Sequence, residues 1–171
     1  MKPILNVDEG ATLTVGHGDA FAARVTPLAE RLGATQIGAN ITAVPPGHAP
    51  YPCHHHYANE EHFFVLSGSG TLRFGADTFP LRAGDYVYTP PGGPEVAHQF
   101  INTGTEELVF LAISTKRLPE VVGYPDSAKT GVRTSSERDS GRFLVEDRHR
   151  DAMGYWDGED GAAVHRIAKG S

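Results

Sequence analysis

The stretch CHHHYANEEHFFVLSGSG, residues 53–70, decides how this sequence is interpreted. It places three histidines and two glutamates directly before an apolar run that ends at two glycines. Six of the nine histidines in the chain lie between residues 48 and 98. Metal-ligand side chains gathered beside an apolar strand pattern indicate a site rather than an incidental surface tract.

Strand geometry decides which of these side chains converge. Alternate side chains of a β-strand share a face, so His54 and His56 are predicted to point together while His55 points away. Two imidazoles at this spacing can both bind one divalent metal ion. A carboxylate is expected from Glu61, at the start of the next strand, and a further imidazole from His98, on another strand. The predicted metal ligands are therefore His54, His56, Glu61 and His98.

The region around this stretch has a sequence pattern that is typical of β-proteins. Segments of four to eight residues, bounded by Gly, Pro, Asn or Asp, recur through residues 38–116 and are typical of strands. No helical segment separates them, which predicts a sandwich or a barrel. We therefore expect an N-terminal arm at residues 1–37, a barrel core at 38–116 and a C-terminal extension at 117–171. The extension is expected to pack on the barrel or across a dimer.

Composition narrows the classes of partner and the compartment. The formal net charge of -6, without a run of Lys and Arg, argues against a nucleic-acid-binding surface. The first residues contain no apolar run long enough for a signal peptide, and the chain has no stretch of about 18 apolar residues for a membrane span. The single cysteine, Cys53, cannot form an internal disulfide, which is typical of a reducing compartment. The sequence predicts a cytoplasmic protein that binds neither nucleic acid nor a membrane.

Two motifs of the sequence resemble those of the cupin superfamily. The segment that resembles the first motif consists of Gly47, six residues, His54-x-His56, four residues, Glu61, six residues and Gly68. The second is similar to GDYVYTPPGGPEVAHQFIN, residues 84–102, with about three extra residues between Gly92 and His98. The departures fall in loops. The resemblance implies an all-β fold, the cupin double-stranded β-helix or jelly-roll barrel, with a metal at the four predicted ligands.

Longer segments resemble a narrower group of small, single-domain bacterial cupins. They are PPGHAPYPCHHHYANEEHFFVLSGSGTL, LAISTKRLPEVVGYPDSAKTGV and YWDGE, which cover much of the chain. Some members of that group are labelled as sugar phosphate isomerases. The resemblance implies an enzyme that acts on a small polar metabolite, of the sugar or sugar-phosphate isomerase or epimerase type. It also implies a homodimer in which Tyr155 and Trp156 are buried at the interface, unless they pack on their own barrel.

The expected ligand set leaves both the metal and the reaction open. Three imidazoles and one carboxylate leave free positions on octahedral Mn, Fe, Co or Ni and nearly close a tetrahedral Zn. The expected cofactor is one divalent ion, either Zn, Ni, Mn or Fe. Fe(II) with dioxygen would favour a dioxygenase, whereas a redox-inert ion that polarises a carbonyl would favour isomerisation. A third alternative is a non-catalytic barrel that captures a small molecule.

Two further groups of residues bear on an isomerase. Glu60 and Tyr57 are the candidate proton-transfer residues, although Glu60 at the turn is also expected to be solvated. A sugar phosphate would require Arg or Lys beside its phosphate. The barrel core offers Arg73 and Arg82 for this purpose, and the C-terminal extension offers Lys129, Arg133, Arg138 and Arg142.

Overall fold

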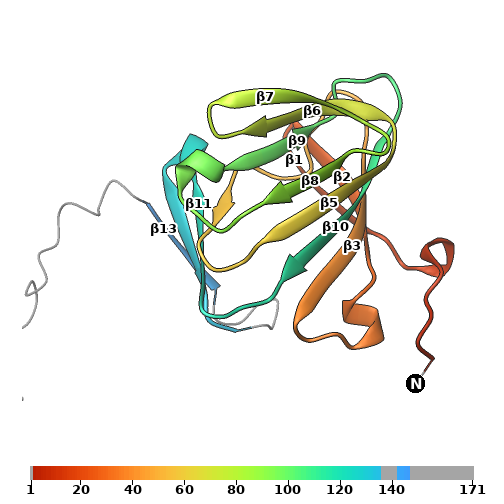
Figure 1. Cartoon of the computed structure of the whole chain (residues 1–171), viewed down its shortest axis with the longest axis horizontal. Helices are drawn as coiled ribbons and strands as arrows, with labels where there is room; N and C mark the ends of the chain where they lie inside the picture. The colour runs from red at the N-terminus through yellow and green to blue at the C-terminus, as the bar shows by residue number, and fades with distance from the viewer. Residues whose placement is uncertain (1, 136–141, 147–171) are drawn as a thin grey trace, which may run out of the picture.

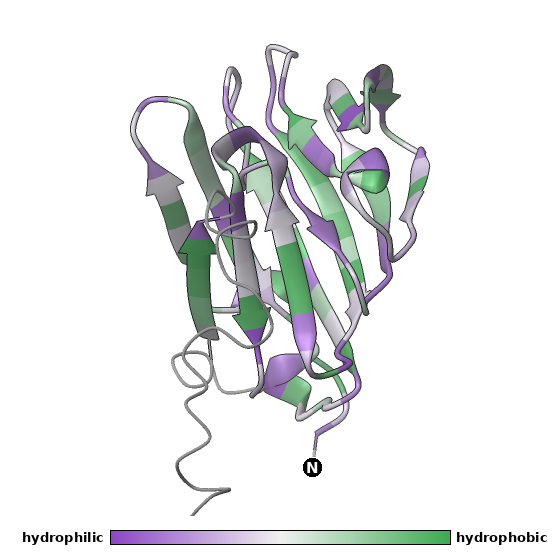
Figure 2. Cartoon of the chain, turned by 90° about the vertical axis from the view of Figure 1, so that its left-hand side faces the viewer, coloured by the Kyte–Doolittle hydropathy of each residue, from purple (hydrophilic) through white to green (hydrophobic). Residues whose placement is uncertain are grey.

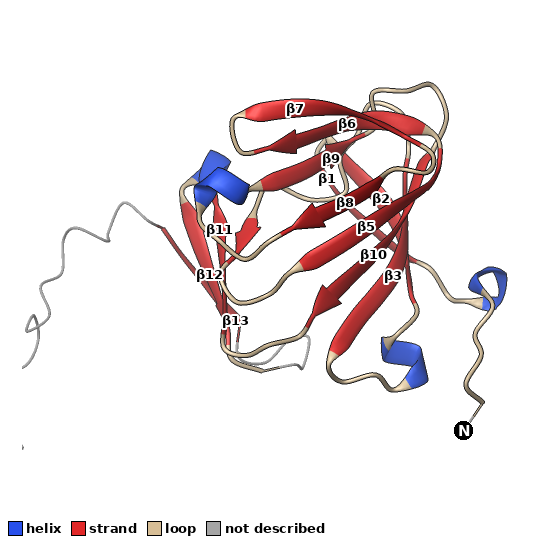
Figure 3. Ribbon diagram, in the orientation of Figure 1, coloured by secondary structure: helices blue, strands red, loops and turns tan. Residues whose placement is uncertain are grey.

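The protein is an all-β molecule in this computed structural model, which describes residues 2–135 and 142–146. Those residues form thirteen β-strands and four 3-10 helices of three residues each (Figure 3). The all-β class is therefore confirmed. None of the helices in the described ranges is long and apolar enough to cross a membrane.

The strands form three sheets in which every pairing is antiparallel. The six-stranded sheet has the order β1 (Leu13–His17), β2 (Phe21–Pro27), β3 (Ile37–Val44), β10 (Leu108–Thr115), β5 (Glu61–Ser67), β8 (Tyr86–Thr89). The three-stranded sheet has the order β7 (Asp77–Arg82), β6 (Ser69–Phe74), β9 (His98–Ile101). The four-stranded sheet has the order β13 (Arg142–Glu146), β12 (Lys129–Arg133), β11 (Glu120–Tyr124), β4 (His55–His56). Because β5 and β6, β7 and β8, β8 and β9, and β9 and β10 belong to different sheets, the chain crosses repeatedly between the six-stranded and three-stranded sheets, as in a jelly roll.

The arrangement of the sheets is visible in Figure 1. The strands β6, β7 and β9 lie along the top of the view, the six-stranded sheet runs diagonally below them, and β11 to β13 stand at the left. The short helices η1 (Val7–Glu9), η2 (Glu30–Leu32), η3 (Pro94–Val96) and η4 (Pro125–Ser127) lie in the connections. Hydrophobic colour follows the strands, while hydrophilic colour gathers at strand ends and turns (Figure 2).

The hydrophobic core is built by the six-stranded and three-stranded sheets. Phe63 and Val65 of β5, Phe100 of β9 and Phe110 of β10 are each less than 9% exposed. The ring of Phe100 lies 4.6 Å, centroid to centroid, from the rings of both Phe63 and Phe110. Burying a phenylalanine side chain contributes about 1.5–3 kcal/mol, so this cluster is a main source of stability. Phe63 and Val65 lie two and four positions after Glu61, and Phe100 lies two after His98, so strand alternation turns them to the same face as these residues.

The outer regions also contribute strands. β1 and β2 extend the six-stranded sheet, and β11 of the C-terminal region pairs with β4 through Val122 and His56. Arg73 of β6 holds Asp126 of η4 through two hydrogen bonds of 2.7 Å, which joins the C-terminal region to the barrel. Arg138, Tyr155 and Trp156, and the side chain of Arg142, lie outside the described residues, and the domain boundaries stay a prediction.

Four strand starts meet at one end of the molecule. Glu61, His98 and Glu120 are the first residues of β5, β9 and β11, and the short strand β4 is His55–His56. Strands from all three sheets thus deliver their first side chains to one place. That end of the barrel holds the candidate site.

Candidate metal centre

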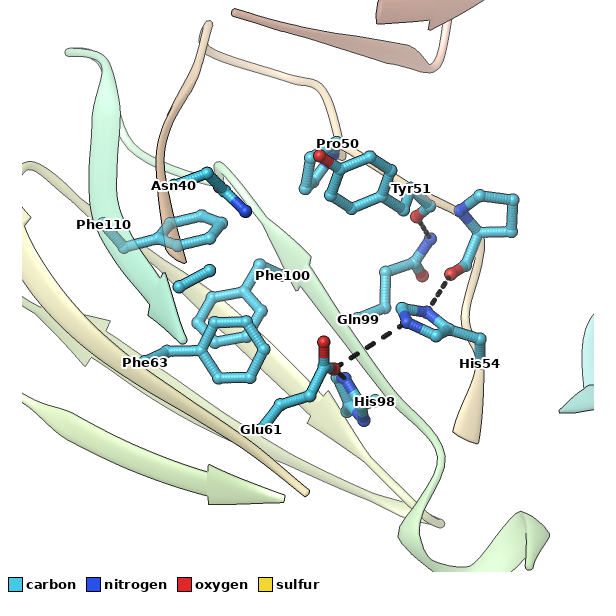
Figure 4. A pocket seen from close by; sticks show the side chains of 12 residues that line it. Asn40, Pro50, Tyr51, His54, Glu61, Phe63, His98, Gln99, Phe100 and Phe110 are labelled. Atoms are coloured by element: carbon cyan, nitrogen blue, oxygen red, sulfur yellow. Dashed lines mark hydrogen bonds and ion pairs between the residues drawn. The ribbon is translucent and has the colours of Figure 1, made fainter. Parts of the chain in front are cut away.

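Three imidazole nitrogens face one carboxylate oxygen at this end of the barrel. The Oε2 atom of Glu61 lies 3.0 Å from Nε2 of His98, 3.5 Å from Nε2 of His56 and 4.0 Å from Nε2 of His54. Donor atoms of His54, Glu61 and His98 all lie within 4.8 Å of one another. Imidazole and carboxylate are the ligands that Zn, Mn, Fe and Ni sites use in proteins. His54, Glu61 and His98 therefore form a candidate metal site (Figure 4).

Backbone pairing places His54 beside His98. The two residues form an antiparallel bridge in which each amide donates to the other's carbonyl, at 3.2 Å and 2.8 Å. Their ring centroids are consequently only 4.7 Å apart. The convergence is a product of strand pairing between segments more than forty positions apart in the sequence.

The second nitrogen of each of these rings faces a backbone carbonyl. Nδ1 of His54 lies 2.9 Å from the carbonyl of Pro52, and Nδ1 of His98 lies 3.4 Å from that of Val96. A carbonyl only accepts, so Nδ1 of His54 carries the proton and its Nε2 presents a lone pair. Orientation of a ligating histidine through its other nitrogen is typical of metal sites. A metal ion would replace the proton that Nε2 of His98 now donates to Glu61.

His56 lies between two carboxylates. Its Nε2 faces Glu61, and its Nδ1 is 3.7 Å from Oε1 of Glu120, a side chain that is 4% exposed. Oε1 of Glu120 accepts hydrogen bonds from the amides of Tyr57 and Ala58, at 3.2 Å and 3.3 Å. Both ring nitrogens of His56, and Oε2 of Glu120, are buried without a hydrogen-bond partner among the described residues. Such atoms are rare in native interiors, and they fit a metal at Nε2 with Glu120 behind the ligand.

The pKa values of His54, His56 and Glu61 are strongly shifted from their usual range. Burial, together with the neighbouring His98, lowers the pKa of His54 to about 4. Burial also acts to lower the pKa of His56, but Glu120 and Glu61 outweigh it and raise that pKa to about 9. Burial acts to raise the pKa of Glu61, but His56 and His98 hold it well below its usual range. At neutral pH His54 and Glu61 are therefore in the forms that bind a metal, while His56 must lose a proton first.

A small cavity of about 80 Å³ lies on one side of Glu61. Figure 4 shows His54, Glu61 and His98 at one end of it and the rings of Phe63, Phe100 and Phe110 at the other. Gln99 crosses one wall and donates from Nε2 to the carbonyl of Tyr51 at 2.9 Å. The remaining lining residues are Asn40, Pro50, Pro52 and Ala112. This cavity admits only a molecule of a few atoms.

A second, larger cavity of about 210 Å³ is also lined by Glu61. Its walls carry two carboxylates, the imidazole of His56 and three basic side chains. Glu61 is the residue that lines both cavities. The lining residues are His56, Asn59, Glu61, Ser114, Thr115, Lys116, Arg117, Leu118, Glu120, Val122 and Arg133.

The residues predicted for proton transfer lie apart from the imidazole cluster. Glu60 accepts a hydrogen bond at Oε2 from the hydroxyl of Tyr88, at 3.3 Å, in an exposed contact. Tyr57 is 47% exposed, and its ring packs edge-on against His55, whose Nδ1 bonds the carbonyl of Gly92 at 2.9 Å. As alternation along a strand requires, His55 does not face Glu61. The catalytic roles of Glu60 and Tyr57 stay predictions.

Three residues at the site were not identified from the sequence. Glu120, Lys116 and Arg117 belong to a region that was interpreted as the barrel's last strand and a polar extension. A partial signal existed for Glu120, because it directly precedes the β-branched pair Val121-Val122, which is typical of a strand. No comparable signal marks Lys116 or Arg117, since basic residues after a strand are usually solvated.

Comparison with known proteins agrees with this geometry. A family profile described as a cupin domain matches residues 40–114. The chain is 30% identical to a crystal structure from Acidithiobacillus ferrooxidans described as a candidate sugar phosphate isomerase, with a TM-score of 0.73 over 85% of this chain and 92% of the other. A structure from Silicibacter pomeroyi, described as a sugar phosphate isomerase, is 22% identical with a TM-score of 0.74, over 85% and 94%. At that identity it shows only a shared fold.

The curated relatives match over a shorter region. An oxalate-binding protein from Thermotoga maritima is 33% identical over 70 residues, which are 41% of this chain and 54% of that protein. The chain spans about half the length of the curated relatives it matches.

Proposed function

The chain belongs to the cupin superfamily, and on that premise we propose that it is a metal-dependent isomerase or epimerase of a sugar or sugar phosphate. The observation that carries the proposal is the convergence of three imidazole nitrogens on one oxygen of Glu61, at the wall of a 210 Å³ cavity. The name of the structural relative that is 30% identical supports the choice of reaction.

The proposed ligands are His54, His56, Glu61 and His98, which would hold one divalent ion, either Zn, Ni, Mn or Fe. Such an ion, when bound, supplies a Lewis acid for a substrate oxygen. His54 already presents a lone pair, and Glu61 supplies a charge that offsets part of the ion's charge.

Isomerisation also requires a group that moves a proton between neighbouring carbon atoms of the substrate. Glu120 is favoured for this role by geometry, because its Oε2 is buried, has no hydrogen-bond partner and belongs to a residue that lines the larger cavity. The same oxygen can return the proton to the adjacent carbon, so the reaction consumes no co-reactant. Glu60 and Tyr57 remain candidates from the sequence, but each would have to move to reach a molecule in that cavity.

The decisive experiment combines elemental analysis with a substrate panel. Protein purified without a histidine tag should contain about one divalent ion per chain, and it should interconvert a ketose–aldose or epimer pair until a chelator is added. The double substitution His54→Ala, His56→Ala should remove metal and turnover together, while His17→Ala, at an exposed histidine of β1, should keep both. Retention of full stoichiometry by the double variant would show that the ligand set is wrong. Iron with metal-dependent uptake of dioxygen would identify an oxygenase instead.

A non-catalytic binding module is the second candidate, and the small cavity favours it. A volume of about 80 Å³ beside His54, Glu61 and His98 suits a two-carbon dicarboxylate, and one curated relative is named as an oxalate-binding protein. Oxalate at about 100 times its dissociation constant would then stabilise the metal-loaded fold by roughly 2.7 kcal/mol. Stabilisation by oxalate without turnover of any sugar would favour this candidate over the isomerase.

We also propose that the chain forms a homodimer in the cytoplasm, as the sequence predicts. Support comes from the outer face of the six-stranded sheet, where Tyr86 lies opposite Phe64 and Tyr88 opposite His62. Phe64, Tyr86 and Tyr88 are 41%, 64% and 46% exposed, although the solvent face of an antiparallel sheet is usually polar. Sedimentation should show a dimer that the substitution Phe64→Glu dissociates. A wild-type protein that sediments as a monomer contradicts the proposal.

A further inference from the structure

We infer that the larger cavity contains an anion subsite, in which Lys116, Arg117 and Arg133 bind the phosphate of a small phosphorylated hydroxy-carbonyl compound. This inference rests on the proposed function, because it places the phosphate in the cavity that opens on the candidate metal centre. The subsite would select phosphorylated substrates over the parent sugars.

The walls of the cavity differ in charge. His56, Glu61 and Glu120 contribute the wall at the metal centre, and the basic side chains contribute the rest of the polar lining. The acidic groups are compensated locally, because Glu61 faces three imidazoles and Glu120 accepts two backbone amides beside His56. A ligand with an uncharged oxygen-rich end and an anionic end therefore matches the cavity better than a uniformly charged ligand does.

Among the residues that the structure describes, no acid neutralises the two adjacent cations. Within residues 2–135 and 142–146, no carboxylate forms an ion pair with Lys116 or Arg117 at 4.0 Å or less. Arg24 and Arg73 differ in this respect, since they pair with Glu107 at 2.9 Å and with Asp126 at 2.7 Å. Unpaired cations in a concave, partly enclosed site strengthen the attraction of an anion.

The segment that bears these cations is held in place by a buried amide. Asn59 is 7% exposed, and its Oδ1 accepts hydrogen bonds from the hydroxyl of Thr115 and the amide of Arg117, at 2.8 Å and 2.6 Å. The Nδ2 atom of Asn59 donates to the carbonyl of Arg117 at 3.0 Å, and the amide of Lys116 donates to the backbone carbonyl of Gln36 at 2.9 Å. The backbone beneath the two cations is therefore fixed before any ligand arrives, which lowers the entropy cost of binding.

The third cation approaches from the neighbouring strand. Arg133 of β12 is the cross-strand partner of Glu120 on β11, so the two side chains share a face of that sheet. Its Nε donates to the carbonyl of Ser135 at 3.1 Å, which orients the guanidinium. A phosphate carries about 1.5–2 negative charges and three acceptor oxygens, which matches two guanidinium groups and one ammonium. The volume of about 210 Å³ suits a compound of a few carbon atoms and excludes a nucleotide.

The test measures binding to the full-length, metal-loaded protein by calorimetry. The probes are inorganic phosphate, a panel of sugar phosphates and the corresponding parent sugars. The double substitution Lys116→Gln, Arg117→Gln should weaken binding of phosphate and of the best sugar phosphate by about tenfold or more, because hydrogen bonds to charged groups are stronger than those between neutral groups. Affinity for the parent sugar and the metal content should stay unchanged.

The matched control removes two positive charges elsewhere. Arg24→Gln with Arg82→Gln changes the net charge equally on exposed side chains that do not line the cavity. Equal weakening in this control, or unchanged phosphate affinity in the Lys116–Arg117 variant, overturns the subsite. Loss of phosphate binding from that variant, with no turnover by the wild type, supports the subsite and counts against the isomerase. Turnover of sugars that is indifferent to the phosphate and to both substitutions supports the isomerase and overturns the subsite.

Discussion

The two cavities that share Glu61 differ in what lines them. The smaller cavity ends at the rings of Phe63, Phe100 and Phe110, which are among the most buried side chains of the core. The larger cavity is lined by carboxylates, basic side chains and buried nitrogens without hydrogen bonds. One side of the candidate metal centre thus stabilises the fold, and the other contains groups that favour a ligand. In this small barrel, the residues that stabilise the fold and the residues that favour a ligand therefore line different cavities, and Glu61 lines both.

Substitution of the shared residue should have the largest effect. Glu61→Gln keeps the size of the side chain but removes the negative charge that faces His54, His56 and His98. We expect metal content to fall from about one ion per chain to less than about a tenth, because a neutral amide is a poorer ligand for a divalent ion. Elemental analysis after dialysis measures this.

Glu60→Gln is the control for that substitution. Glu60 is the adjacent residue but bonds Tyr88 on an exposed face, so its loss should leave the metal content unchanged. Equal metal loss in both variants would mean that the centre is not organised around Glu61.

Phe63→Ala tests whether the apolar wall of the smaller cavity is part of the core. This substitution removes a ring that packs against Phe100 and Phe110, and it should lower the free energy of unfolding by about 3–5 kcal/mol. Urea denaturation of the metal-free protein measures the change. Phe79→Ala, at a side chain that is 48% exposed, should cost less than about 1 kcal/mol. Similar costs at both positions would show that the small cavity is not part of the core.

The stability of the metal-free protein should depend on pH through the histidines of the candidate metal centre. The pKa of His56 is raised from 6.5 to about 9, so its stabilising charge is fully present below pH 6.5 and is lost as the pH rises toward 9. The pKa of His54 is lowered to about 4, so stability also falls as the pH drops from 6.5 toward 4, because the unfolded chain takes up the proton first. We expect maximal stability near pH 6.5, with an alkaline loss on the order of 2–3 kcal/mol.

The substitution His56→Gln should remove the loss of stability above pH 6.5 and leave the loss of stability below pH 6.5 in place. His17→Gln, at an exposed histidine, should leave both. Thermal unfolding between pH 4 and pH 9 measures these slopes. An alkaline decline that persists in His56→Gln would assign it to another group.

The smallest effect is expected at Glu120, behind His56. Glu120→Gln removes the carboxylate that faces Nδ1 of His56 at 3.7 Å, and such partners of ligating histidines contribute about ten- to a hundredfold to metal affinity. Competition with a chelator should reveal a loss in this range, with the ion still bound at saturation. Glu107→Gln, at a surface ion pair with Arg24, should not change the affinity. Unchanged affinity in Glu120→Gln would show that Glu120 does not support His56 as a metal ligand.

Much of the fold and part of the site could be predicted from local sequence patterns. Side-chain alternation is a property of two or three consecutive residues, so it separates Glu61 from Glu60 and His54 from His55 without knowledge of the fold. The same rule places Phe63 and Phe100 in the core, and turn residues divide the chain into short strands. The sequence by itself therefore determined the all-β class, the inward faces and the residues His54, Glu61 and His98, which the structure brings together.

The tertiary structure decided what surrounds those residues. Glu120 reaches His56 only because β11 pairs with β4, and Lys116 and Arg117 are positioned by Asn59, more than fifty positions earlier in the chain. Sheet order and crossover connections depend on the packing of the whole core, and no local period encodes them. For that reason the presence of an apolar and a charged cavity that are both lined by Glu61 is a property of the folded molecule alone.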